Sequence, residues 1–374
     1  MTPIQPSPHS SPFDRQVVAL LGLPFDVLDM AQAVGRVRQA AHNGQRCFIS
    51  TPNLNFLVSA QSDSAFRDSV LHSDLSLVDG MPLVWISKLL QLPIRERVPG
   101  SGLFEQMGGQ LPPPVRVYFF GGQPGVAQRA HERVNQNGPR GLVSVGYADP
   151  GSGDLQTMSA KPLIDAINLA EPQFLVVALG AKKGQRWIEH NLSQLHAPVV
   201  SHLGAVVNFV AGTLNRAPER WQQWGLEWVW RIKEEPALWR RYWHDGCCFL
   251  GLVFTRVLPH ALAVRSRHPD QLQPAELLQE AEAGGAWVLR GAWTSPRLRP
   301  LREAFASAVD HQRSTPLILD LSQVSYVDSH FIGLMMLARG VFRGGLTLRG
   351  APPKVAKIFH HHVATYLLSP ATGD

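Results

Sequence analysis

The sequence predicts an α/β fold, because short buried strands alternate with helical segments along the first two thirds of the chain. Apolar runs bounded by polar residues, glycine or proline predict strands at residues 17–21, 47–50, 75–78, 115–120, 142–145, 174–179 and 199–201. Helical patterns separate most of them, at residues 27–41, 82–90, 126–136 and 160–170. Such alternation favours a mainly parallel, Rossmann-like sheet with helices on both faces.

A second α/β unit is expected near the C-terminus, since 374 residues are many for one core. Strands are expected at residues 286–290, 317–321 and 346–349, and helices at 297–311, 330–342 and 352–362. The predicted organisation is a disordered N-terminus (1–14), a first domain (15–245), an apolar helix with a polar linker (246–283) and a second domain (284–374).

Composition narrows the function classes. No signal peptide is recognisable, and three cysteines provide no disulfide framework, which fits a reducing cytoplasmic compartment. The net charge of +6 favours anionic partners such as phosphorylated substrates or an anionic membrane surface. No nucleic-acid-binding signature accompanies the charge, so we expect no nucleic acid partner.

Polar and glycine residues directly follow several predicted strands. Ligands bind beyond the carboxyl ends of parallel strands, where such residues converge. They are Thr51, Asn53, Asp79, Gly121, Gly122 and Gly180.

Asp79 is the strongest candidate for chemistry. A carboxylate at a strand end, followed by a glycine that lets a substrate approach, can serve as a general base. The residues alone favour another role for Asp79, a turn aspartate that caps the helix expected near residue 82. Thr51 and Asn53 carry the same alternative, since a helix is expected to follow them too.

Residues 216–243 interleave tryptophan with arginine, which suits a surface that binds an anionic and partly apolar ligand. Helical spacing brings Trp224, Trp228 and Arg231 near one another. The alternative is an amphipathic helix with tryptophans in the core and arginines in water.

Several blocks in this order resemble the WecG/TagA/CpsF glycosyltransferases, glycosyltransferase family 26. They are TPNLNF with VDGMP, RVPGSG, VYFFGGQPG, FLVVALG and the RAP, GLEWVWR and RRYW pieces, over residues 16–245. The resemblance implies transfer of a sugar from a UDP-sugar to a polyprenyl-diphosphate-linked sugar in bacterial surface-polysaccharide assembly. The segment at about 205–245 then corresponds to the family's C-terminal appendage.

The resemblance also implies roles for individual residues. Asp79 matches the proposed base, and Thr51 and Asn53 occupy the T-x-N positions that orient substrate. The glycine turn at Gly121 and Gly122 is assigned to the UDP-sugar. Arginines are expected to bind diphosphate, namely Arg97, Arg216, Arg231, Arg240 and Arg241. The chain lacks a D-x-D motif, so we expect a reaction without divalent metal. We further expect an inverting transfer that needs no other cofactor.

Two segments depart from the family pattern. The usual G-x-P-x-Q-E becomes Gly180 to Gln185, and the F-D pair becomes Val207-Asn208. Gly180, Gln185 and Asn208 remain expected substrate contacts, but the donor stays open among N-acetylmannosamine, its uronic acid, glucose and glucuronic acid. A catalytically degenerate transferase fold acting as a scaffold or regulator is the alternative.

Residues 247–264 are apolar but contain Arg256, Pro259 and His260. A central arginine disfavours a membrane-spanning helix, so we expect a helix packed on the protein or lying at the membrane interface. Together with the lipid-linked acceptor, this predicts peripheral contact with the inner face of the cell membrane.

The sequence PLILDLSQVSYVDSHFIGLMMLARG resembles a STAS domain, the fold of anti-sigma factor antagonists, over residues 284–368. Signalling members carry a modifiable Ser or Thr after Asp-Ser, whereas His330 follows Asp328-Ser329 here. We therefore expect a docking or regulatory module with a protein partner rather than a kinase switch. The three consecutive histidines at 360–362 are expected at an exposed helix end rather than on a metal.

Overall fold

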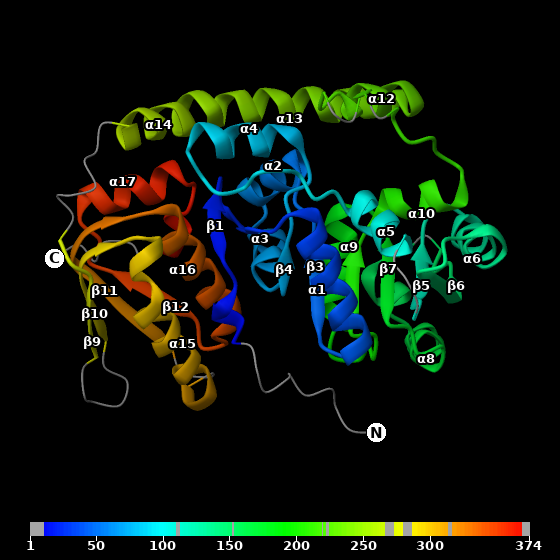
Figure 1. Ribbon diagram of the computed structural model, residues 1–374, viewed down its shortest axis with the longest axis horizontal. Helices are drawn as coiled ribbons and strands as arrows, with labels where there is room; N and C mark the ends of the chain where they lie inside the picture. The colour runs from blue at the N-terminus through cyan, green and yellow to red at the C-terminus, as the bar shows by residue number, and fades with distance from the viewer. Residues whose placement is uncertain are drawn as a thin grey trace.

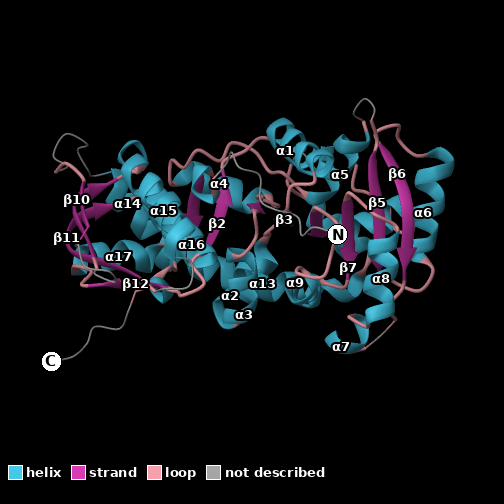
Figure 2. Ribbon diagram, turned by 90° about the horizontal axis from the view of Figure 1, so that it is seen from below, coloured by secondary structure: helices cyan, strands magenta, loops and turns pink. Residues whose placement is uncertain are grey.

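The computed structural model describes residues 11–109, 113–151, 153–218, 220–221, 224–265, 273–279, 286–312 and 316–368. The molecule is elongated, with one sheet towards each end and a two-stranded hairpin between them (Figures 1 and 2).

The larger sheet confirms the predicted parallel α/β domain. Its six strands lie in the order β4-β3-β8-β7-β5-β6, and every neighbouring pair is parallel. They are β3 (Cys47–Ser50), β4 (Leu75–Ser76), β5 (Val115–Gly121), β6 (Leu142–Ala148), β7 (Phe174–Ala178) and β8 (Val199–His202). Each overlaps a predicted strand.

Helices cover both faces of this sheet. They are α1 (Met30–Asn43), α5 (Gly100–Gly108), α6 (Val126–Asn137), α7 (Leu155–Met158), α8 (Lys161–Leu169), α9 (Ala181–Asn191) and α10 (Gly204–Ala211). Three further helices, α2 (Leu54–Ser62), α3 (Ser64–Leu71) and α4 (Met81–Leu89), pack with residues 18–25 in a separate apolar cluster. Phe119 packs in the core shared with α1, α5, α6 and α10, whereas Phe120 packs on the other face with α8 and α9. Burial on both faces explains why the strands are continuous apolar runs rather than alternating patterns.

The first predicted strand does not join the parallel sheet, which corrects the expectation for residues 17–21. Strand β1 (Val17–Leu20) instead pairs antiparallel with β2 (Leu23–Asp26), a strand that the sequence analysis missed. Leu21 and Gly22 both have positive φ, as a two-residue hairpin of type I′ requires. A buried ion pair joins Arg15 to Asp26 at 2.7 Å, and Asp26 also accepts the N–H of Ser76 in β4 at 2.7 Å, which attaches the hairpin to the sheet.

The segment after α10 forms a long helical arm along one edge of the molecule (Figure 1). The arm, residues 227–265, comprises α12 (Glu227–Glu234), the 3-10 turn Pro236–Leu238, α13 (Trp239–Leu252), the π-helical turn Val253–Val257 and α14 (Leu258–Arg265). Within the described residues, Pro236–Val264 is long and apolar enough to cross a membrane, and little of it is buried. The arm lies across both domains, since Asn55 of α2 donates to Asp245 of α13 at 3.0 Å and α14 contacts α17.

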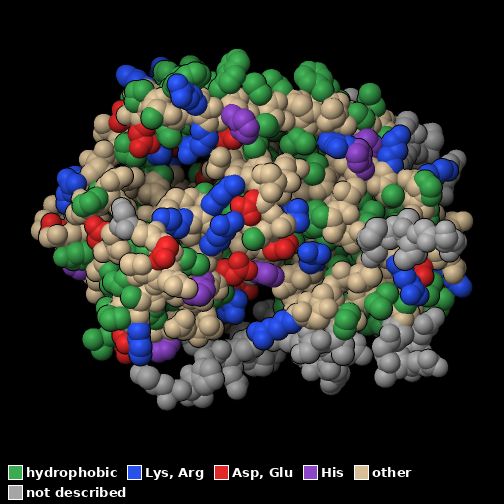
Figure 3. All heavy atoms as spheres, turned by 180° about the vertical axis from the view of Figure 1, so that it is seen from behind, with side chains coloured by type: hydrophobic (Ala, Val, Ile, Leu, Met, Phe, Trp, Pro, Cys, Tyr) green, Lys and Arg blue, Asp and Glu red, His purple; other side chains and the backbone are tan. Residues whose placement is uncertain are grey.

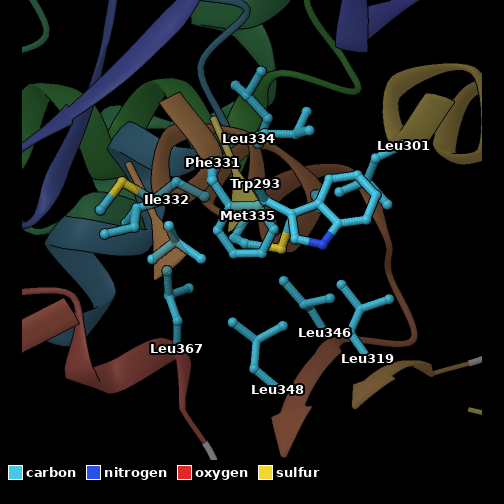
Figure 4. Close-up of a cluster of buried hydrophobic side chains, with 14 of the residues drawn as sticks. Trp293, Leu301, Leu319, Phe331, Ile332, Leu334, Met335, Leu346, Leu348 and Leu367 are labelled. Carbon is cyan, nitrogen blue, oxygen red and sulfur yellow. The ribbon is translucent and has the colours of Figure 1, made fainter. Parts of the chain in front are cut away.

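The C-terminal domain is a mixed four-stranded sheet with helices. The strand order is β12-β11-β10-β9, with only β9 antiparallel to its neighbour. Its elements are β9 (Glu276–Gln279), β10 (Trp287–Trp293), the turn Ser295–Arg297, α15 (Arg299–Gln312), β11 (Leu317–Val327), α16 (Ser329–Val341), β12 (Leu346–Arg349), α17 (Pro353–His361) and the turn Thr365–Leu367. Strand β9 lies inside residues 246–283, which were expected to form an apolar helix and a polar linker. Its pairing with β10 is a tertiary contact, which the local sequence pattern does not reveal. Figure 4 shows part of the core, in which Trp293 and Phe331 lie among leucines.

The hairpin joins the two domains through helix α16. Ser329 donates to the carbonyl of Ala19 at 2.8 Å, and Phe13, Val17 and Leu71 belong to the same apolar cluster as the C-terminal core. Gly333 permits this contact, since a Cβ there would lie 3.1 Å from the backbone of β1.

The histidines at the end of α17 are not all exposed, contrary to expectation. His361 and His362 are buried and pack against His260 of the arm, with ring centroids 5.5 and 4.7 Å from its ring. Burial holds the pKa of His362 down at about 4, so the His362 ring is neutral near pH 7.

Candidate active site

Three loops meet at the carboxyl edge of β3 and β4. The N–H of Leu77 donates to Ser50 at 2.9 Å, and the N–H of Asp79 donates to Pro52 at 3.0 Å. The N–H of Val98 in turn donates to Val78 at 2.7 Å. These bonds bring Thr51, Asp79 and Arg97 into one region. The proximity of Thr51 and Asp79 was predicted, because both follow strands of the parallel sheet.

Asp79 does not cap the helix that follows it. Helix α4 begins after Gly80, whose φ of 151° is unfavourable for other residues, and no side chain caps that helix. The Asp79 carboxylate is therefore not committed to a helix end.

Asn53, by contrast, is an N-cap, since its Oδ1 accepts the N–H of Phe56 at 3.2 Å. Asn53 therefore does cap a helix, as the alternative interpretation expected. Because Oδ1 is used by the cap, the amide NH2 is the group that could donate to a ligand. Thr51 lies beside it and is buried.

The charges around Asp79 are mixed. Burial raises the pKa of Asp79, the Glu227 carboxylate raises it further, and Arg97, Arg216 and Arg231 lower it, which leaves the pKa at about 7. A carboxylate with a pKa near neutrality can both exist as the base and take a proton efficiently at physiological pH. A carboxylate base among three arginines suits proton abstraction next to a bound diphosphate.

Each of these arginines is already held by a carboxylate. Arg97 donates to Glu227 of α12 at 2.7 Å, Arg216 pairs with Glu105 of α5, and Arg231 bonds Glu235 one turn along α12 at 3.2 Å. The loop after α4, the segment after α10 and the arm thus each contribute one guanidinium. The family resemblance predicted the arginines but not these acidic partners.

Arg240 and Arg241 occupy a different environment. Both are exposed on α13, where their guanidinium groups lie 5.6 Å from the Trp239 ring and 5.2 Å from the Tyr242 ring, respectively. The predicted set of appendage arginines therefore divides into half-buried members near Asp79 and exposed members along the arm.

The glycine turn after β5 has the conformation that the sequence suggested. Gly121 and Gly122 have φ of 90° and 99°, and a Cβ on Gly121 would lie 2.9 Å from the Ala178 carbonyl. Helix α6 follows Gly125 and α9 follows Gly180, and neither helix has a side-chain cap at its N-terminus. Uncapped helix N-termini present N–H groups that favour phosphate.

Gln185 and Asn208 are engaged inside the protein. Gln185 is fully buried and donates to Ser50 Oγ at 3.1 Å, so its side chain packs in the core rather than lining a surface, which corrects its expected role. Asn208 on α10 is half-buried, and its Oδ1 accepts from Thr213 at 3.2 Å.

Two family models match this chain. The model of the glycosyl transferase WecG/TagA/CpsF family matches residues 18–262. The chain belongs to that family. A STAS-domain model, described as "Mlab, STAS domain", matches residues 277–362.

Curated relatives are similar over the transferase region. An N-acetylglucosaminyldiphosphoundecaprenol N-acetyl-beta-D-mannosaminyltransferase from Bacillus spizizenii (strain ATCC 23059 / NRRL B-14472 / W23) is 29% identical over 222 residues, covering 59% of this chain and 82% of the relative. A protein of the same name from Staphylococcus aureus (strain NCTC 8325 / PS 47) is 25% identical, covering 57% and 83%. The chain is thus a WecG/TagA/CpsF glycosyltransferase, a hexosyltransferase-type enzyme, with a C-terminal STAS domain.

This glycosyltransferase carries a histidine that the sequence analysis missed. His202, at the end of β8, places its ring so close to Gly184 that a Cβ there would lie 2.2 Å from the imidazole. Burial lowers the pKa of His202 to about 4, and its Nε2 has no hydrogen-bond partner. The imidazole therefore fills the space above Gly184, where the family pattern has glutamine. The glycine at position 184, where the family has glutamine, was the sequence signal that could have pointed to His202 at the end of the next strand.

The arm of this glycosyltransferase exposes a row of large apolar side chains. Exposed members on or beside the arm are Trp85, Trp224, Trp228, Trp239, Trp243, Leu250, Phe254 and Leu262. Figure 3 shows hydrophobic side chains gathered along this edge, with lysine and arginine near them. A large exposed apolar patch with charged residues around it is typical of an interaction surface.

Proposed function

We propose that this enzyme transfers a sugar from a UDP-sugar to a polyprenyl-diphosphate-linked sugar during bacterial surface-polysaccharide or exopolysaccharide synthesis. The observation that carries the proposal is the poised Asp79 carboxylate among Arg97, Arg216 and Arg231. The names of the curated relatives support the acceptor, since both act on a diphosphoundecaprenol-linked sugar by name.

In the proposed reaction, the acceptor hydroxyl oxygen attacks the anomeric carbon of the donor. Asp79 takes the hydroxyl proton while the bond from the anomeric carbon to the UDP oxygen breaks, and UDP leaves with the electron pair. A single displacement inverts the anomeric configuration. Thr51 and the amide NH2 of Asn53 would orient the reacting sugars.

Charge on the departing UDP would be stabilised by guanidinium groups and by backbone N–H groups of the glycine turn. Arginine binds phosphate oxygens in bidentate fashion, so the three half-buried arginines can replace a metal ion in this role. We therefore propose a metal-independent reaction, with Gly121, Gly122 and Gly180 at the nucleotide side of the site.

The donor sugar is proposed to be a UDP-linked hexose of the N-acetylmannosamine, N-acetylmannosaminuronic acid, glucose or glucuronic acid type. The relatives' names favour N-acetylmannosamine. The Gly184 and His202 pair and Asn208 change the polar groups at the strand ends, so the donor is best chosen by direct screening.

We further propose that the enzyme works at the inner face of the cell membrane, bound peripherally through the arm. Tryptophans favour the headgroup region, and the exposed Arg240 and Arg241 suit lipid phosphates or the acceptor diphosphate. A lipid-linked acceptor cannot leave the bilayer, so an apolar edge that continues into α12 would bring it to the site. The STAS domain would hold the far end of the arm and provide a docking surface for a regulatory protein.

A degenerate transferase that acts as a STAS-linked scaffold is the second candidate. It is motivated by the altered residues at 184, 185 and 208, two of which are engaged in contacts within the protein.

A donor screen separates the two candidates. Full-length protein would be incubated with each UDP-sugar and a polyprenyl-diphosphate N-acetylglucosamine acceptor, with EDTA present. The expected result is one glycosylated lipid product that Asp79→Asn does not form and Asp165→Asn does, since Asp165 makes an exposed ion pair with Lys161. Absence of product with every donor would favour the scaffold.

A further inference from the structure

The contact between Arg97 and Glu227 connects the transferase domain to the arm. Arg97 Nη1 lies 2.7 Å from Glu227 Oε2, and both side chains are largely buried, with exposed fractions of 16% and 22%. The loop that carries Arg97 is itself anchored, because the adjacent Glu96 accepts the N–H of Met30 at 2.7 Å and Val98 donates to Val78. Glu227 is thus the arm's contact with a loop whose backbone lies against that of Asp79.

We propose that Glu227 is a positioning residue for sugar transfer: its ion pair fixes the Arg97 guanidinium in the region of Asp79, and its carboxylate adds a second negative charge there. This inference rests on the proposed function, since it concerns the same site. It assigns a role to an acid that neither the arginine pattern nor the strand-end motifs identify.

The charges facing Asp79 come from three parts of the chain. Arg97 lies on the loop before α5, Arg216 on the segment after α10, and both Glu227 and Arg231 on α12. Three guanidinium groups without Glu227 would stabilise the ionised form of Asp79 and weaken it as a base. Glu227 offsets one of those positive charges while orienting its guanidinium, so the site can attract a diphosphate and still contain a competent base.

A purely structural role is the alternative. Glu227 begins α12, where an acidic residue stabilises the positive end of the helix. Such a role would affect arm stability but would not change the titration of Asp79. Measurement of that titration therefore distinguishes the two roles.

The variants are Glu227→Gln, which removes the charge, and Glu227→Asp, which keeps it. Glu303→Gln is the matched control, because Glu303 forms an Arg–Glu pair of similar length, 2.8 Å, on the exposed surface of α15. We expect Glu227→Gln to move the acid limb of the kcat/KM profile down by about one pH unit and to lower kcat by about tenfold. Glu227→Asp should keep the limb and recover part of kcat, and Glu303→Gln should match wild type.

A readout without catalysis separates this inference from the proposed function. The difference in unfolding stability between wild type and Asp79→Asn, followed against pH, reports the folded pKa of Asp79. We expect its midpoint to shift down in a Glu227→Gln background. An unchanged midpoint, or an unchanged acid limb in an active enzyme, overturns the role of Glu227. An inactive wild type with a shifted midpoint would instead reject the proposed function alone.

Discussion

The backbone N–H of Asp79 donates to the carbonyl of Pro52 at 3.0 Å, which ties the loop after β4 to the loop after β3. Two motifs that are far apart in sequence are therefore joined through their backbones, since Pro52 lies between Thr51 and Asn53. This arrangement follows from the parallel pairing of β3 with β4, in which Ser50 is opposite Ser76.

Replacement of the proposed base tests this arrangement directly. Asp79→Asn should lower kcat by about 100- to 10,000-fold, the range for loss of a general base, while leaving the circular dichroism spectrum unchanged. Asp165→Asn, in an exposed ion pair on α8, is the control and should retain wild-type turnover. Comparable activity in the two variants would remove Asp79 from the mechanism.

The pH dependence follows from the pKa of Asp79. Because burial and Glu227 raise that pKa to about 7, the base form accumulates only as pH rises through 7. The value of kcat/KM should increase about tenfold per pH unit below pH 7 and level off above it, as measured in buffers of constant ionic strength. A plateau extending down to pH 5 would contradict the assignment.

The raised pKa of Asp79 also means that its ionised carboxylate destabilises the folded state at high pH. The folded state binds a proton at Asp79 more tightly than the unfolded chain, so this residue's contribution to stability decreases as pH rises from about 4 to 7. Asp79→Asn should therefore raise the melting temperature at pH 8 and change it little at pH 4. Scanning calorimetry at both pH values checks the sign.

The half-buried arginines should differ from exposed ones in nucleotide binding. Arg231→Lys is expected to weaken UDP binding and lower kcat/KM by about tenfold or more, because lysine cannot reproduce a bidentate phosphate contact. Arg299→Lys, in an exposed helical ion pair of the STAS domain, is the control. Titration calorimetry with UDP measures the affinity, and equal affinities would place the diphosphate elsewhere.

Membrane binding should depend on the arm's apolar stripe. Trp243→Ser together with Phe254→Ser removes two highly exposed rings, with exposed fractions of 71% and 66%, and should reduce co-flotation with anionic liposomes by about tenfold or more. Leu169→Ser is the control, since Leu169 is 87% exposed on α8, away from the arm. Undiminished flotation of the double variant would argue against this edge as the membrane surface.

The close approach of the two domains should be sensitive to one added methyl group. A Cβ on Gly340 of α16 would lie 2.3 Å from the carbonyl oxygen of Leu71, so Gly340→Ala should destabilise the protein by about 1–3 kcal/mol. Gly35→Ala on α1, where nothing lies within 4 Å of the added Cβ, should be neutral or stabilising by up to about 1 kcal/mol. Urea denaturation of both variants compares them.

The local features of this protein were predictable from its sequence. Each strand of the parallel sheet is a short apolar run, and Asp79 follows β4 as Thr51 follows β3, because strand ends depend on nearby residues. Helix boundaries were predicted less well, as in α1, which begins at Met30 after the Asp29 cap rather than at residue 27. The family resemblance extended this reasoning to the arginines of the appendage.

Contacts between distant segments were decided only by the tertiary structure. The run at 17–20 is as apolar as a strand of the parallel sheet, yet the turn at Leu21 and Gly22 folds it into a hairpin against α16. Likewise, His361 and His362 are buried because the arm crosses α17, and Glu227 meets Arg97 across 130 residues of chain. Periodicity reports which residues favour burial, but which surfaces meet depends on how whole elements pack.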